Sequence, residues 1–209
     1  MSQPTHTERR SFLTRFHLGA ASLAAVALGG IAKAQTKPAA PFVPTRHEKD
    51  DWMDSLGGKH RMVVDTVSTD GARDGLLFAG NFMLANRNDY GLQNTDIGLI
   101  VVVRHLSTGY GFNNDMWAKY GASLGDAKEP LKANPNAASM ANLATQGVHF
   151  AICAMATRRL AGQIARAGGT TDAIFAELSA NTVANGHMVA AGIIAVNRAQ
   201  ERGYSFVSA

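Results

Sequence analysis

The chain contains one cysteine, Cys153, and its thiol is the side chain best suited to covalent chemistry. It follows the apolar run VHFAI at 148–152 and precedes AMATRRL at 154–160, which is rich in helix formers. A strand that runs directly into a helix would place Cys153 at the carboxyl edge of a parallel sheet, where ligands bind in open α/β folds. Unpaired N–H groups at the start of a helix also stabilise a thiolate. The sequence therefore favours a reactive Cys153, and the alternative is a buried, inert thiol.

Two basic side chains could stabilise an anionic sulfur at this position. Arg158 lies on the turns that follow Cys153 and would add positive potential if its side chain turns back towards the sulfur. His105 and Arg104 follow the apolar run 97–103, so they also fall at a predicted carboxyl edge of the sheet. We predict a site formed by Cys153, Arg158 and His105. Helix capping or a subunit contact is the alternative role for Arg104 and His105.

Other polar residues have simpler explanations. His149 precedes Cys153 by four residues on the same predicted strand, which separates the two by ~13 Å. That distance excludes a Cys–His dyad and favours a hydrogen-bonded core or interface histidine. Asp65 and Asp70 could form a catalytic carboxylate pair. Helix capping explains Asp70 equally well, and solvation at the end of a strand explains Asp65.

The sequence predicts no cofactor and no metal site. Gly109 and Gly111 lack the third glycine of a dinucleotide-binding fingerprint, and their loop follows the wrong strand for one. Neighbouring histidine and methionine residues, such as His187 with Met188, could ligate copper in principle. They show no repeated spacing that would indicate such a site.

Strands and helices alternate from residue 59 onward. Runs rich in apolar or β-branched residues predict strands at 61–67, 97–103, 148–153, 181–184 and 204–207. Helical patterns predict helices at 72–89, from about 113, at 154–168, at 171–179 and at 187–202. The stretch 124–145 is irregular, and at most about one helical turn is expected in it. This alternation predicts an α/β fold: a single domain with a doubly wound, mainly parallel sheet flanked by helices.

The first 34 residues have the three parts of an export signal. Arg9 and Arg10 precede an apolar stretch at 18–31, and the small-residue motif AKA follows at 32–34. The apolar stretch is about 14 residues long, whereas a membrane-spanning helix needs roughly 20. The paired arginines followed by SFL resemble a twin-arginine (Tat) signal. We therefore predict a Tat signal peptide at 1–34, cleavage after Ala34 and a periplasmic mature protein.

Charge and composition limit the partners of the mature chain. The whole chain carries a net charge of +4, and the predicted signal accounts for most of it. The remainder is close to neutral and has no basic stripe for phosphates, so nucleic acid is not a predicted partner. No second stretch is long and apolar enough to cross a membrane. A membrane is therefore not an expected partner after the signal is cleaved. Prolines and a charged run predict an extended linker at 35–58, followed by the domain at 59–209.

Several segments together resemble one protein family. The run GVHFAIC at 147–153, with ATRR at 156–159, resembles the strand–cysteine–helix segment of DsrE-like proteins, which include the sulfur-relay subunits DsrE, DsrF and TusD. The ending is also similar, with VANG at 183–186, an apolar helix, and QERGYSFV at 200–207. The resemblance implies a small α/β sandwich around a parallel sheet, assembled as trimers or hexamers. It also implies that Cys153 matches the residue on which relay members hold a persulfide.

The resulting hypothesis is an exported DsrE-like protein that handles sulfur, with Cys153 as the persulfide site. Its expected partners are further copies of itself, as a trimer or hexamer, and a thiol or sulfane-sulfur donor or acceptor protein. Trp117 and Tyr120, three residues apart on one predicted helical face, indicate either internal packing or a subunit contact. The alternative function is a non-enzymatic periplasmic binding or assembly module in which Cys153 is structural. Two features differ from relay members: the export signal, and Ala154-Met155 where many relatives have a polar residue after the cysteine.

Overall fold

The structure is a computed structural model in which residues 42–125 and 131–209 are described. The predicted signal peptide, its cleavage site and most of the predicted linker lie outside these residues. The compact unit Val43–Ala209 contains a five-stranded sheet of order β4-β3-β2-β1-β5, and every neighbouring pair of strands is parallel. The strands are β1 (His60–Thr66), β2 (Ile97–Val103), β3 (His149–Cys153), β4 (Gly186–Val189) and β5 (Ser205–Ser208). The predicted α/β fold with a parallel sheet flanked by helices is confirmed.

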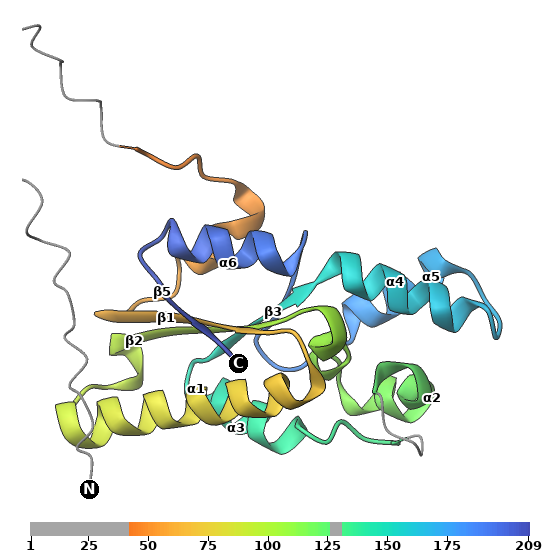
Figure 1. The fold of residues 1–209 in the computed structure, drawn as a ribbon, viewed down its shortest axis with the longest axis horizontal. Coiled ribbons are helices and arrows are strands. Elements are labelled where there is room, and N and C mark those ends of the chain that lie inside the picture. Colours follow the sequence, from red (N-terminus) through yellow and green to blue (C-terminus); the bar gives the residue numbers. More distant parts are fainter. Residues whose placement is uncertain (1–41, 126–130) are drawn as a thin grey trace, which may run out of the picture. The chain divides into compact units, whose positions relative to one another are not determined.

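Helices cover both faces of the sheet, as Figure 1 shows. One face carries α6 (Gly192–Gln200) and the 3-10 helix η1 (Glu48–Met53). The other face carries α1 (Thr69–Tyr90) and α3 (Ala137–Thr145). The carboxyl ends of the strands lead towards η3 (His105–Gly111), α2 (Asn114–Leu124), α4 (Ala154–Ala165) and α5 (Thr171–Ala180). A short 3-10 helix, η2 (Asn94–Asp96), precedes β2.

The central strand explains why the sheet needs cover on both sides. All seven residues of β2 are buried, because alternate side chains enter two different apolar clusters. Leu99 and Val101 pack in the cluster beneath α1, whereas Ile100 and Val102 pack with residues of α6 and η1. The same alternation assigns Cys153 to the α6 face, because Ala151, two residues earlier on β3, belongs to the α6 cluster.

The start of the domain differs from its prediction. The segment expected to be an extended, solvated linker instead forms η1, and Met53 and Leu56 are buried in the α6 cluster. The 3-10 helix buries Met53 although most of its neighbours in the chain are charged. The sequence did not predict this helix because its amphipathic pattern is too short to stand out. The predicted N-cap of α1 is also wrong. Ser68, and not Asp70, caps this helix by accepting a hydrogen bond from the Gly71 N–H.

The fourth strand lies five residues later than predicted. Thr182, expected within a strand, makes only an isolated antiparallel bridge to Phe112. Asn185 then adopts a left-handed backbone with φ of 55° and donates its side-chain amide to the Ala144 and Val148 carbonyls. This turn aligns Gly186 with Phe150, so β4 occupies residues that were predicted as the start of a helix. Helix α6 consequently begins at Gly192, and the predicted irregular stretch before β3 contains α3.

Candidate functional site

Cys153 lies at the junction that the sequence predicts, as the last residue of β3 and the N-cap of α4. Its Sγ accepts a hydrogen bond from the Ala156 N–H at 3.4 Å, and the Thr157 hydroxyl donates to the Cys153 carbonyl at 2.9 Å. The first N–H groups of a helix carry partial positive charge, and the sulfur lies next to those of α4. The side chain is 7% exposed and packs with Ala156 and Ala191.

An ion pair lies beside the thiol at the carboxyl edge. Arg104 donates from Nε and Nη2 to the two carboxylate oxygens of Asp65, each at 2.7 Å. Asp65 is buried, whereas 27% of the Arg104 side chain is exposed. The two hydrogen bonds to Asp65 are the main cause that raises the pKa of Arg104, followed by the charges of Asp65 and Cys153. The guanidinium is thus a fixed cation whose charge interacts with the sulfur. We call Asp65, Arg104 and Cys153 the thiol cluster.

The backbone after β2 holds Arg104 in place. The buried Ser107 hydroxyl accepts from the Arg104 N–H at 2.9 Å and lies 2.9 Å from the Thr66 carbonyl at the end of β1. It also accepts from the Thr66 hydroxyl, which lies 2.9 Å away. These bonds join the ends of β1 and β2, so the positions of Asp65 and Arg104 are set by the sheet register. Because Asp65 already holds the Arg104 side chain in one geometry, Arg104 would lose little side-chain entropy on interacting with an anion.

The start of α6 completes the cover over Arg104. A Cβ atom on Gly192 would lie 2.5 Å from the Arg104 Cβ, so only glycine fits at this point. Ala191, the N-cap of α6, offers no side-chain hydrogen bond to the first N–H groups of the helix. The starts of α4 and α6 therefore both lie next to the thiol cluster, and both helix dipoles favour negative charge there.

The structure places Arg158 and His105, the other two predicted site residues, in different surroundings. Arg158 forms an ion pair with Asp172 at 2.7 Å and stacks over the Phe175 ring at 4.3 Å, so its guanidinium faces α5. The expectation that it turns back towards the sulfur is wrong. His105 is exposed, with a left-handed φ of 57°, and it lines a hollow with Arg159 and Gln163 of α4. Arg104, its neighbour in the chain, occupies the position beside Cys153.

His149 belongs to a second polar cluster on the same face of the sheet. Its Nδ1 lies 2.8 Å from the Nε2 of His187 on β4, so one imidazole donates a hydrogen bond to the other. The indole of Trp52 stacks on His187, with ring centroids 4.0 Å apart and planes inclined by 5°. Burial lowers the pKa of both histidines, and burial together with the His149 charge brings that of His187 to about 4. We call Trp52, His149 and His187 the imidazole cluster. This arrangement agrees with the predicted hydrogen-bonded histidine.

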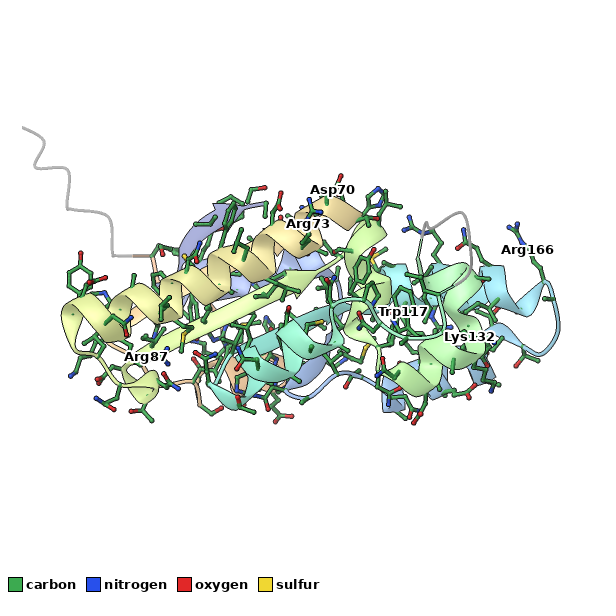
Figure 2. All side chains as sticks on the ribbon, turned by 90° about the horizontal axis from the view of Figure 1, so that it is seen from below. Asp70, Arg73, Arg87, Trp117, Lys132 and Arg166 are labelled. Carbon is green, nitrogen blue, oxygen red and sulfur yellow. The ribbon has the colours of Figure 1, made fainter. Side chains whose placement is uncertain are left out.

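The aromatic pair of α2 packs inside the chain. Trp117 is fully buried and donates from its indole to the Gly109 carbonyl at 3.0 Å (Figure 2). The Tyr120 hydroxyl donates to Glu177 of α5 at 2.6 Å. Of the two roles predicted for this pair, internal packing is the one that the contacts support, so Trp117 gives no reason to expect a subunit interface.

Residues 42–125 and 131–209 contain neither a cluster of metal-binding side chains nor a membrane-spanning helix. No group of three or more histidine, cysteine, aspartate or glutamate side chains in these ranges could hold a metal ion. None of the helices in these ranges is both long and apolar enough to cross a membrane.

Comparisons with known proteins leave the chemistry to this geometry. No family model and no curated protein matches the chain. Among solved structures, a protein of unknown function from Methanobacterium thermoautotrophicum is similar over 72% of this chain and 100% of that chain, with 16% sequence identity and a TM-score of 0.44. A likeness at this level carries no argument about function.

Proposed function

We propose that the protein is an exported, DsrE-like sulfur carrier in which Cys153 holds a persulfide. The observation that carries the proposal is the position of the thiol, at the start of α4 and beside the fixed guanidinium of Arg104. A persulfide is more acidic than a thiol, so it is an anion at neutral pH. One cation and two helix starts form a suitable environment for such an anion.

The proposed transfer needs only thiol–persulfide exchange. The Cys153 thiolate attacks the outer sulfur of a donor persulfide, R–S–SH. The bond between Sγ and that sulfur forms, the donor S–S bond breaks, and the electron pair leaves with R–S⁻. An acceptor thiolate then attacks the outer sulfur of Cys153–S–SH, which releases the Cys153 thiolate. Both steps are balanced without an added oxidant or reductant.

Arg104 would act through its charge and not as an acid. Because the two hydrogen bonds to Asp65 raise its pKa, the guanidinium keeps its proton throughout the exchange. Its role would be to stabilise the negative sulfur before and after transfer. A change to lysine would keep the charge but lose the two-pronged hydrogen bond that fixes it. We therefore expect Arg104→Lys to transfer sulfur more slowly than the unchanged protein.

Intact mass spectrometry after incubation with polysulfide tests this function directly. We expect an adduct of about 32 Da, one sulfur atom, that a thiol reductant removes. It should be absent from Cys153→Ser, and Arg158→Ala should behave like the unchanged protein because Arg158 pairs with Asp172. An unmodified protein, or an adduct that survives Cys153→Ser, would overturn the proposal.

Export through the Tat pathway is the second part of the proposal, and the sequence of the first 34 residues supports it. Changing Arg9 and Arg10 together to lysine should leave the full-length precursor in the cytoplasm, because the arginine pair is the recognition element. The matched control is Arg15→Lys, which leaves the pair intact. Processed double mutant in the periplasm would contradict Tat export.

Self-assembly as a trimer or hexamer is proposed from the family resemblance, with a thiol protein as the sulfur donor or acceptor. Homo-oligomers of this kind close by cyclic or dihedral symmetry. Light scattering should give a mass that is a multiple of three chains. A monomer at micromolar concentration would contradict this part of the proposal and leave the thiol chemistry untouched.

One observation favours the alternative of a non-enzymatic binding or assembly module. Cys153 is only 7% exposed, and burial beneath Ala156 and Ala191 is what a structural thiol also shows. Under this alternative the sulfur is a small packing group, and Cys153→Ala would change no reaction. The polysulfide experiment separates the two functions, because a packing thiol gains no sulfur.

A further inference from the structure

The outer side of α1 carries leucine side chains that the domain leaves exposed. This helix of 22 residues packs Ala72, Ala79 and Met83 against the sheet. Leu77 and Leu84 point away from the sheet and are 57% and 48% exposed. Because seven residues make close to two turns, these two leucines lie in line along the helix. A line of exposed leucines is typical of a helix that packs against a second helix.

A hollow of about 460 Å³ lies beside this line of leucines, between α1 and α3. Leu77 and Asn81 line it from α1, and Asn142 and Leu143 line it from α3. Side chains of one helix pack into the grooves of another, so a second helix laid along α1 could place an apolar side chain in this hollow. The surface therefore offers a recess as well as exposed leucines.

Charged side chains of opposite sign end the line of leucines. Asp74 comes three residues before the first leucine, and Arg87 comes three residues after the second. Figure 2 labels Arg73, the neighbour of Asp74, and Arg87 near opposite ends of the helix. The recorded contacts are long: Arg73 Nε lies 3.7 Å from Asp74, and Arg87 donates to the neutral Gln146 at 3.4 Å. Asp74 and Arg87 can therefore pair with charges of a second molecule.

The order of these residues matches a second copy of the same helix that runs in the opposite direction. Across a two-fold axis, residue i of one copy contacts residue j of the other, and j contacts i. With the axis between residues 80 and 81, Leu77 opposes Leu84 and Asp74 opposes Arg87. Each contact occurs twice, so the pair of helices would have leucines on both sides of the axis and an ion pair at each end.

Other arrangements of two copies lose these matches. A shift of one residue sets either Arg73 against Arg87 or Leu77 against Ala85. A parallel pair sets Asp74 against Asp74, and like charges placed opposite each other repel. The antiparallel pair avoids this repulsion, because the charges of the surface sum to zero over Asp70, Arg73, Asp74 and Arg87.

We propose that α1 is the contact surface for a second copy of this chain, bound antiparallel across a two-fold axis. The inference goes beyond the proposed function, because it predicts an even number of chains from the residues of α1 and does not use the family resemblance. Helix α1 lies on the face of the sheet opposite α6, the side to which Cys153 is assigned (Figure 1). Sulfur uptake by Cys153 should therefore not depend on this contact.

Exchange of the two charges within α1 tests the pairing. Sedimentation equilibrium of the mature protein should give two chains, or six if the trimer of the proposed function also forms. Asp74→Arg or Arg87→Asp alone sets like charges against each other and should halve this mass. The double variant has both ion pairs again, with the charges exchanged, and should restore the mass. Asp70→Arg is the control, because it changes the charge equally and lies opposite Gly91, which has no side chain.

A second pair of variants tests the leucine contact. Leu77→Asp should weaken the association at least about tenfold, because it places a carboxylate against Leu84 of the second copy. Ile193→Asp is the matched control, since Ile193 is 56% exposed but belongs to α6 on the other face of the sheet. Circular dichroism should show that both variants keep their helices. Equal weakening by the two variants would overturn the proposal.

The assembled state separates this contact from the proposed function. A monomer or an isolated trimer would overturn the α1 contact, and so would a double variant that stays dissociated. A dimer would support the α1 contact and contradict the trimer of the proposed function, whereas a hexamer would support both. Asp74→Arg should gain the same adduct of about 32 Da from polysulfide as the unchanged protein. Failure of sulfur uptake would therefore leave the α1 contact standing.

Discussion

The thiol cluster and the imidazole cluster lie on the same face of one sheet and keep their polar groups buried in opposite ways. In the thiol cluster, the buried Asp65 accepts two hydrogen bonds from Arg104, which also supplies an opposite charge. In the imidazole cluster, no carboxylate of residues 42–125 or 131–209 pairs with His149 or His187, and burial lowers the pKa of each histidine.

The difference shows what each cluster can do. The Arg104 guanidinium, whose pKa is raised by its hydrogen bonds to Asp65, stays charged and can act on a neighbouring anion. Buried imidazoles stabilise a fold while they are neutral, and protonation at low pH removes that stabilisation. We therefore place the proposed chemistry at the thiol cluster, and we expect the imidazole cluster to have a stabilising role, the attachment of η1 through Trp52.

The largest expected loss of stability comes from breaking the Asp65–Arg104 ion pair. Asp65→Asn removes the charge that compensates Arg104 and should lower the free energy of unfolding by about 2–4 kcal/mol, because a partly buried guanidinium loses its counterion. Urea denaturation near neutral pH measures this change.

The control is an ion pair of equal length in a different place. Arg158 and Asp172 are also 2.7 Å apart, but 88% of the Asp172 side chain is exposed. Asp172→Asn should cost about 0.5 kcal/mol or less. Equal losses for the two variants would contradict the claim that burial makes the thiol cluster different.

A smaller effect is expected at the contact between α6 and Arg104. Gly192→Ala would place a Cβ atom 2.5 Å from the Arg104 Cβ, so the start of α6 or the guanidinium must move. We expect a loss of about 1–3 kcal/mol from overpacking, measured by thermal or urea unfolding. Gly80→Ala on α1 is the control, because nothing lies within 4 Å of the added atom. It should leave stability unchanged or raise it slightly.

The imidazole cluster predicts a pH dependence of stability. The pKa of His187 is lowered to about 4 in the folded state, so the unfolded chain binds more protons below about pH 6.5. Stability is therefore fully present above about pH 6.5 and falls as the pH drops towards about 4. We expect a loss of about 1–2 kcal/mol over this range, less than the full shift would give because the ring is only half-buried.

Urea unfolding at several pH values measures this dependence. His187→Gln should flatten the curve, whereas His60→Gln, at an exposed position, should not. An unchanged slope in His187→Gln would show that protonation of the imidazole cluster does not control stability. Trp52 fluorescence should report the same transition, because its indole stacks on the His187 ring.

Sequence reasoning found the elements whose patterns are strong and missed those set by distant contacts. The apolar run 97–103 could only be a central strand, and β2 has these bounds. The β4 strand was misplaced because its start depends on the left-handed Asn185 and its bonds to two distant carbonyls. The burial of Met53 likewise depends on packing against α6 and not on local pattern.

In the candidate site, too, the feature with a local sequence signal was predicted and the feature set by distant contacts was not. The position of Cys153 followed from a strand that runs into a helix, which is a local signal. The pairing of Asp65 with Arg104 could not be predicted from a local signal, because the two residues become neighbours only through the parallel register of β1 and β2. A carboxylate near the end of one strand and an arginine just after the next was the available signal. Arg158, nearer to Cys153 in sequence, is drawn to α5 by Asp172 and Phe175.

The central claim is that Cys153 is a reactive thiol in the folded protein, and the most direct measurement is its alkylation by iodoacetamide without denaturant. We expect complete labelling at Cys153 under native conditions near neutral pH. Labelling should be slower in Arg104→Gln, which removes the cation beside the sulfur, and unchanged in Arg158→Gln. Labelling that begins only when denaturant unfolds the protein would contradict the claim and identify Cys153 as a packing residue.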